Sequence, residues 1–248
     1  MLEQELVAVG ICCAVGNLGE GIDTHHPTWA PITRTAHYQL HAQLGPALNA
    51  MLTDNDPDQR ATASYANFTT AIDTALQHGL PVLPVLAPVE ELLDQNRQHT
   101  TREHLLHQAI TALSTRTDDS ARTERISLLD LAGRVAQVQQ RFDQAEDYYR
   151  QALQAYRDTD DERAASQVAT RLGRVLADTG RHTEAFPVLV EAAVGWRRST
   201  GEFDSGDIGL LEDQRPHLDQ HTIDGVIDAL DPTTATALRQ RLDQPDQT

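Results

Sequence analysis

LAGRVAQVQQRFDQAEDYYRQA, residues 131–152, is followed at an offset of 40 residues by RLGRVLADTGRHTEAFPVLVEA, residues 171–192. The two copies carry the same residue at six matching positions. These are Gly133, Arg134, Val135, Arg141, Ala145 and Ala152 in the first copy, and Gly173, Arg174, Val175, Arg181, Ala185 and Ala192 in the second. The apolar residues between them have helical spacing. A period of this size indicates a supersecondary unit stacked on a copy of itself, and it predicts a helical solenoid with an extended surface for partners.

The helical pattern is strongest in the two copies and weaker on both sides of them. Within the copies we predict helices over residues 123–140, 143–156, 161–178 and 183–198. Upstream we predict a helix over 59–78 closed by Gly79, at most a short helix in the proline-rich segment 80–88, and a helical pair at 89–95 and 102–114. Downstream we predict helices at 222–230 and after Asp231, where Pro232 takes the first helical position.

Two helix starts carry the pattern of a capping box, in which a side-chain oxygen accepts from a free N–H and a glutamate reaches back. Thr159 with Glu162 has the usual spacing, and Asp143 with Glu146 is an aspartate version of it. The acidic pairs Asp118-Asp119 and Asp160-Asp161 are likewise interpreted as helix starts.

Composition restricts both the fold and the chemistry. Aromatic residues make up only 4% of the chain, and alanine and leucine supply most of the 40% that is hydrophobic, which favours packed helices over sheet. All 20 basic residues are arginine, which excludes a phosphate-loop lysine or a Schiff base. A net charge of -17 disfavours nucleic acid as a partner.

The cysteines and the apolar segment near the N-terminus predict where the protein resides. The only cysteines, Cys12 and Cys13, are adjacent, so neither a disulfide framework nor a zinc spacing exists. Residues 5–16 are too short to span a bilayer. We therefore predict a cytoplasmic protein that does not associate with a membrane and needs no cofactor.

The two copies resemble tetratricopeptide repeats, and this resemblance covers residues 126–198. In that family a small residue in the first helix and alanines in the second allow close crossing, roles matched here by the two glycines and four alanines. Tyr149 and Leu189 match the large residue that fills the space between the helices. The period is 40 where the common form has 34, and Leu129 and Ala169 replace the usual first-helix tryptophan. The resemblance implies an all-α fold, a right-handed α-solenoid of antiparallel helix pairs.

A weaker resemblance concerns the N-terminal part of the chain. ELVAVGI, residues 5–11, followed by Tyr38-Gln39-Leu40-His41, resembles the end of the winged-helix module of signal-transducing NTPases of the STAND class. The segment 66–79 resembles the helix that opens their C-terminal repeat arm. This implies a short β-hairpin within the first 40 residues, and a chain that is the sensor arm of such a regulator. The alternative is a stand-alone repeat protein.

The candidate binding residues follow from the tetratricopeptide resemblance. In that family the position after the packing glycine faces the concave groove, so Arg134 and Arg174 would both line it. The groove residues predicted in this way are Asp130, Arg134, Gln137, Thr170, Arg174 and Asp178. Guanidinium groups bind carboxylates in bidentate fashion, which predicts a peptide carboxylate or acidic side chain as the ligand. Alternatively, the arginines pair with the neighbouring aspartates and only solubilise the surface.

Histidines carry the rival hypothesis, a metal-dependent hydrolase on a helical scaffold. His37 and His41 are four residues apart, and His104 and His107 three apart, spacings that can place two imidazoles on one helix face. No glutamate follows His37 as a metallopeptidase would require, and no nucleophile motif is present. We therefore predict neither a metal site nor catalytic residues.

The sequence thus predicts three segments and a non-catalytic function. Residues 1–55 would form a small winged-helix-like segment, 56–204 the repeat domain, and 205–248 a polar helical cap. The protein would bind a peptide or partner protein in its groove, as an arm or adaptor in signalling or regulation. A scaffold that only assembles homo-oligomers is the further alternative.

Overall fold

The computed structural model describes residues 71–87 and 99–243, and the chain divides into two compact units, residues 1–125 and 126–248. The segment 1–55, the β-hairpin within it and the helix predicted at 89–95 lie outside the described residues. Within the described residues every regular element is a helix. The predicted all-α solenoid is confirmed as the fold class.

The first unit contains short helices joined by tight connections. Residues 71–78 are helical, and Gly79 ends this helix with a positive φ of 66°, as predicted. The proline-rich segment holds a short helix over 83–87, whose preceding backbone is anchored by the buried carboxylate of Glu124. Glu124 accepts hydrogen bonds from the Val82 and Leu83 N–H groups at 2.5 and 2.6 Å. Helix α5 (His99–Ser114) includes the predicted helix 102–114.

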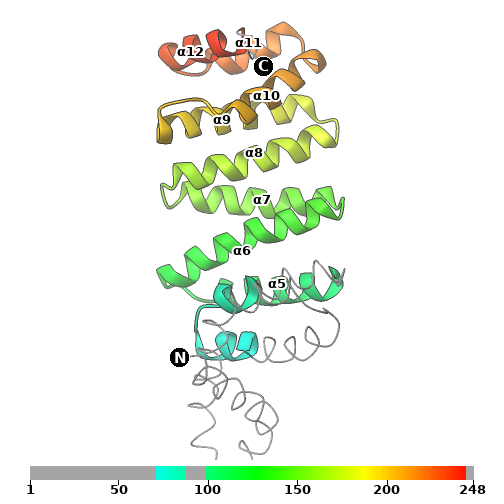
Figure 1. Cartoon of the computed structure of the whole chain (residues 1–248), viewed down its shortest axis with the longest axis vertical. Coiled ribbons are helices and arrows are strands. Elements are labelled where there is room, and N and C mark those ends of the chain that lie inside the picture. Colours follow the sequence, from blue (N-terminus) through cyan, green and yellow to red (C-terminus); the bar gives the residue numbers. More distant parts are fainter. Residues whose placement is uncertain (1–70, 88–98, 244–248) are drawn as a thin grey trace, which may run out of the picture. The chain divides into compact units, whose positions relative to one another are not determined.

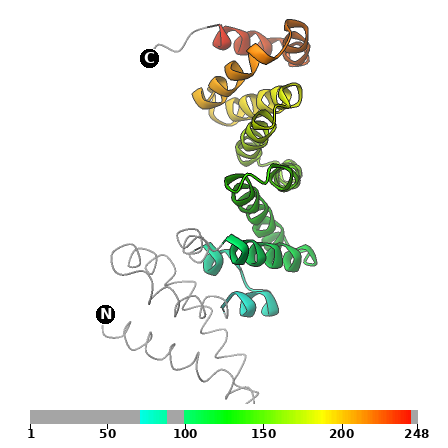
Figure 2. The same cartoon turned by 90° about the vertical axis from the view of Figure 1, so that its right-hand side faces the viewer.

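The second unit is a stack of helices that follow one another in chain order (Figures 1 and 2). Helix α6 begins in the first unit and continues into the second. The elements are α6 (Asp119–Val138), α7 (Phe142–Arg157), α8 (Glu162–Asp178), α9 (His182–Thr200), α10 (Ser205–Gln214), the 3₁₀ helix η1 (Arg215–His217), α11 (Gln220–Asp228) and α12 (Pro232–Leu242). All four helices predicted for the two copies are present, which confirms the repeat as a pair of helical hairpins.

Glycine allows the two helices of each hairpin to cross closely, as the pattern predicted. A Cβ placed on Gly133 would lie 2.5 Å from the Tyr149 ring, and one on Gly173 would lie 2.5 Å from Leu189. Both distances are far inside van der Waals contact, so a larger residue at either position would force the facing side chain to shift. Tyr149 and Leu189 are fully buried, and so are the four recurring alanines of the second helices.

The two predicted capping boxes are wrong, although the helices begin close to where they were predicted. Asp161 is the N-cap of α8, and its carboxylate accepts from the Ala164 N–H at 3.0 Å. Thr159 instead donates to carbonyl oxygens at the end of α7, because the chain still turns back on that helix at this point.

Helix α7 has no side-chain cap. Arg141 takes the N-cap position, and Asp143 already lies in the first turn. Glu146 does not reach back to the helix start, because its carboxylate pairs with Arg150 at 2.8 Å and with Arg181 at 2.5 Å. Opposite charges within reach thus outweigh the local backbone partner that a capping box would use. Asp118 does act as predicted for a helix start, accepting from the Ala121 N–H at 2.9 Å.

The C-terminal helices cover the last apolar surface of the second repeat. One continuous core joins α9 to α10, α11 and α12, with Phe186, Ile208 and Leu238 fully buried in it. Asp231 caps α12 through the Thr234 N–H at 3.0 Å, with Pro232 at the first helical position, as predicted. The predicted start of a separate cap at residue 205 stays a prediction, although α10 to α12 pack as such a cap would.

Candidate recognition surface

Polar side chains connect the first helices of successive hairpins across one surface of the second unit. Asp130 on α6 accepts a hydrogen bond from Arg171 on α8, with 2.9 Å between Oδ1 and Nη1. Thr170 on α8 donates to Asp207 on α10 at 2.7 Å. Asp130 and Thr170 are 40 residues apart and so hold the same repeat position. We call this surface, with α6, α8 and α10 along it, the first-helix face.

The Tyr149 hydroxyl is at the centre of the charged residues of this face. It donates to the Gln137 side-chain oxygen at 2.9 Å. Burial raises the pKa of the Tyr149 phenol, Asp130 raises it further, and Arg171, Arg134 and Arg174 lower it. All these charges therefore lie near one buried hydroxyl group, which remains protonated at neutral pH.

Arg134 and Arg174 differ in how they are held. Arg134 is 3.8 Å from Asp130, and its side chain is 52% exposed while that of Asp130 is 16% exposed. Arg174 is exposed, and within the described residues it forms no hydrogen bond or ion pair. The alternative that neighbouring aspartates neutralise these arginines therefore finds only a long contact at Arg134 and none at Arg174. Both guanidinium groups are accessible.

Asp207 is an almost fully buried carboxyl group, with 4% of the residue exposed. Burial raises its pKa, whereas the Thr170 hydroxyl lowers it, Asp204 raises it and Arg174 lowers it. Thr170 Oγ1 also lies 3.0 Å from the Ser166 carbonyl oxygen. The single proton of the Thr170 hydroxyl is thus shared between the Asp207 carboxyl group and this carbonyl oxygen.

The structure brings together five of the six predicted groove residues. Asp130, Arg134 and Gln137 lie around the Tyr149 hydroxyl, and Thr170 and Arg174 lie near Asp207. Asp178 is the exposed last residue of α8, and within the described residues it has no hydrogen bond or ion pair.

Sequence reasoning missed Arg171, the Tyr149 hydroxyl group and Asp207. The equivalent of Arg171 in the first copy is Leu131, so no repeat signal marked it. Asp207 lies beyond the repeated pattern, and α10 lacks the Gly-Arg-Val signature that would have identified it as a first helix.

The second helices α7 and α9 are joined by ion pairs of their own. Arg181, predicted to be structural, donates to Glu146 on α7 and to Glu184 on α9. Arg157 donates to both carboxylate oxygens of Glu191, with 2.9 Å between Nε and Oε1. This side therefore carries matched charges, unlike the first-helix face.

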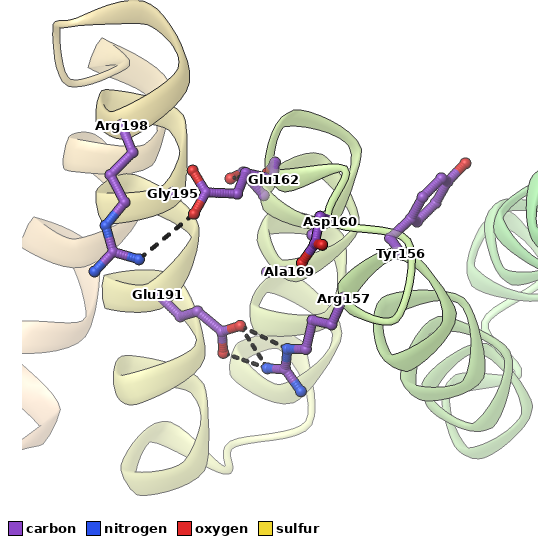
Figure 3. Close-up of a pocket in the computed structure, with 10 residues that line it drawn as sticks. Tyr156, Arg157, Asp160, Glu162, Ala169, Glu191, Gly195 and Arg198 are labelled. Carbon is purple, nitrogen blue, oxygen red and sulfur yellow. Dashed lines mark hydrogen bonds and ion pairs between the residues drawn. The ribbon is translucent and has the colours of Figure 1, made fainter.

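A pocket of about 210 Å³ lies among α7, α8 and α9 (Figure 3). Small residues line it on α8 and α9: Ala165, Ser166, Ala169 and Gly195. Charged side chains surround it, with the Arg157–Glu191 pair on one side and Arg198 and Glu162, 3.8 Å apart, on the other. None of these residues was predicted to form a site.

The rival metal hypothesis gains no support from the described histidines. His104 and His107 are exposed on α5, and the other predicted pair, His37 and His41, lies outside the described residues. Within residues 71–87 and 99–243, no group of three or more histidines, cysteines, aspartates or glutamates is placed to hold a metal ion. In that same part of the chain, no helix is both long enough and apolar enough to cross a bilayer.

Comparison with known proteins agrees with the hairpin geometry. The sequence model of the tetratricopeptide repeat family matches residues 123–193, which include both Gly-Arg-Val copies. Over these residues the two hairpins are therefore similar to tetratricopeptide repeats. Such repeats generally serve as modules for protein–protein interaction and are typically non-catalytic.

One solved structure resembles nearly the whole chain. It is the crystal structure of BtubC (BKLC) from P. vanneervenii, with a TM-score of 0.58, 13% sequence identity, and coverage of 98% of this chain and 95% of that chain. At this identity the likeness shows the fold alone. A search among curated proteins found no sequence match.

Proposed function

We propose that the tetratricopeptide repeats bind a partner protein along the first-helix face, with Arg134 and Arg174 holding a carboxylate of that partner. The observation that carries the proposal is the state of Arg174, which is exposed beside the buried Asp207 and has no ion pair within the described residues. An arginine fork in this state is ready for a bidentate contact with a carboxylate.

The neighbouring side chains support this assignment by fixing the surface on which the arginines stand. Asp130 is engaged mainly by Arg171, so it does not neutralise Arg134 fully. Tyr149 and Gln137 hold each other by a hydrogen bond, and burial keeps the Tyr149 ring in one position. A partner would therefore meet a preorganised surface with two available guanidinium groups, and each charge-assisted contact would contribute about 1.5–3 kcal/mol.

The finer features of the function belong to the same proposal. The protein would act without catalysis, as an arm or adaptor in cytoplasmic signalling or regulation. The STAND-like motifs at residues 5–11 and 38–41 suggest a regulator, and they lie outside the described residues. Assembly of the chain with itself is the competing outcome.

Fluorescence anisotropy with labelled acidic peptides tests the proposal. One set ends in a free carboxylate, and a matched set is amidated and has its acidic side chains replaced by amides. We expect the acidic set to bind the wild type, and the Arg134→Ala, Arg174→Ala double variant to lose at least tenfold in affinity. An Arg122→Ala, Arg150→Ala variant has the same net charge and should bind as the wild type does.

Two results would contradict the proposal. Equal binding by the two double variants would reduce the attraction to a general charge effect. A sedimentation profile that shifts to higher mass with concentration, with no peptide bound, would instead support self-assembly.

A further inference from the structure

We propose that the pocket among α7, α8 and α9 is a second binding site, one that receives a single basic side chain, an arginine or lysine, of a partner protein. It lies beside the ion pair between α7 and α9, and none of the six predicted groove residues lines it. The inference is thus independent of the function proposed for Arg134 and Arg174.

The size of the pocket favours one side chain over a free metabolite. Its volume of about 210 Å³ is below the roughly 300–1,000 Å³ typical of small-molecule sites. Gly195 lets α9 lie close to α8 at the pocket, since a Cβ there would collide with the Ser166 hydroxyl oxygen. Ser166 is itself held by donating to the Glu162 carbonyl oxygen at 2.7 Å. Together with Ala165 and Ala169, these residues leave an apolar floor for the methylene groups of a long side chain.

The three carboxylates around the pocket differ in how closely they are paired with arginines. Glu191 is fully engaged by Arg157, which donates to both of its oxygens (Figure 3). Glu162 is only loosely held, since it lies 3.8 Å from Arg198 and the two side chains are 53% and 61% exposed. The Asp160 side chain has no hydrogen bond or ion pair within the described residues.

The chain conformation also keeps Asp160 at the edge of the pocket. Its φ is 55°, and its N–H donates to the Arg157 carbonyl oxygen at 3.2 Å. The pocket therefore has three carboxylates and two guanidinium groups, an excess of one negative charge. The two less satisfied carboxylates are two residues apart, Asp160 in the turn after α7 and Glu162 at the start of α8.

These charges decide between the classes of occupant. A cation would pair with Asp160 and Glu162 while its stem covers the small residues below. An anion would find Arg157 engaged by both oxygens of Glu191, and beside Arg198 it would meet the carboxylates of Asp160 and Glu162. An apolar side chain would desolvate these carboxylates without pairing with them. The net charge of -17 adds a long-range attraction for a basic partner.

Amide chemical shifts of the ¹⁵N-labelled full chain test this site. The probe is the peptide acetyl-Gly-Gly-Arg-Gly-Gly-amide, and the comparison peptides carry norleucine or glutamate in place of arginine. We expect the arginine peptide alone to cause saturable shifts at Ser166, Ala169 and Gly195. The Asp160→Asn, Glu162→Gln variant should weaken its binding at least tenfold.

Three controls make the test decisive. The Asp143→Asn, Asp147→Asn variant changes the net charge equally on exposed positions of α7 and should keep full affinity. The Arg134→Ala, Arg174→Ala variant should also keep it, which separates this site from the first-helix face. A Gly195→Leu variant, checked for folding by circular dichroism, should abolish the shifts because its side chain collides with Ser166 at the pocket wall.

Other outcomes would overturn the proposal. Equal binding of the norleucine peptide would remove the role of the charge, and unchanged affinity in the Asp160→Asn, Glu162→Gln variant would remove the role of these carboxylates. Putrescine binding as tightly as the arginine peptide would show a free polyamine site in place of a partner's side chain.

Discussion

Thr170 donates a hydrogen bond of 2.7 Å to Asp207, and this contact extends the register of the two repeats to a helix that the repeat pattern does not include. One period earlier, Asp130 contacts Arg171 on the next first helix in the same manner. We interpret α10 as taking the place of a third first helix, which the Thr170–Asp207 hydrogen bond joins to α8.

The first prediction concerns the buried Asp207. Burial raises its pKa above the ordinary 3.8, so between 3.8 and the raised value the folded state binds more protons than the unfolded state. Stability must therefore fall as pH rises through this window. We expect the Asp207→Asn variant to lose the part of the pH dependence of unfolding free energy that Asp207 contributes. Relative to the wild type, the variant should therefore gain stability as pH rises. Denaturant unfolding from pH 4 to 7 measures this difference.

Asp231 supplies the control with the opposite sign. Hydrogen bonds from the Thr234 side chain and N–H lower its pKa, so its contribution is present above pH 3.8 and is lost as pH falls. Asp231→Asn should therefore weaken the protein at neutral pH. If unfolding free energy changes with pH equally in the Asp207→Asn variant and in the wild type, Asp207 does not bind more protons in the folded state, which contradicts the prediction.

Helix crossing in the first repeat gives the second prediction. Gly133→Ala places a methyl group 2.5 Å from the rigid Tyr149 ring, and we expect it to lower the free energy of unfolding by about 1–3 kcal/mol. Gly225→Ala on α11 is the matched control, because a Cβ there meets open space. That change should stabilise by about 0.5–1 kcal/mol. Equal stability of the two variants would refute the close crossing.

The third prediction distinguishes the two candidate caps of α8. Asp161→Ala removes the acceptor of the Ala164 N–H and should cost about 1 kcal/mol of unfolding free energy. Thr159→Ala, at the position that the capping-box pattern favours, should cost clearly less. Thermal unfolding of the two variants side by side measures the difference, and a larger loss at Thr159 would restore the sequence-based assignment.

The fourth prediction concerns the ion pair that joins the two repeats. Burial raises the pKa of Glu146, but the hydrogen bonds from Arg181 and Arg150 outweigh burial and lower this pKa below its ordinary value. A double-mutant cycle with Glu146→Gln and Arg181→Gln should give a coupling energy of about 0.5–1 kcal/mol, since Arg181 is still over a third exposed. The coupling should shrink in high salt. The exposed pair of Arg122 and Asp119 serves as a reference with almost no coupling.

Patterns of small and apolar residues were enough to predict the helical hairpins. Gly133 and Gly173 recur because each must accommodate a large residue of the partner helix, and such steric demands leave a regular trace in the sequence. The ends of α7 and α8 were predicted to within two residues, but their caps were not. A cap depends on which of several nearby acceptors is closest, and Thr159, Asp161 and Glu162 all stand within four residues.

By itself the sequence determined the helical class, the repeat and its close crossings, because these depend on side-chain size and spacing within about 40 residues. Only the tertiary structure decided that Arg171 engages Asp130, that Asp207 is buried against Thr170, and that a charged pocket opens above Gly195. The first two contacts join helices that are not consecutive in the chain, and all three features depend on how each hairpin is rotated on the one before it. No local periodicity records that rotation.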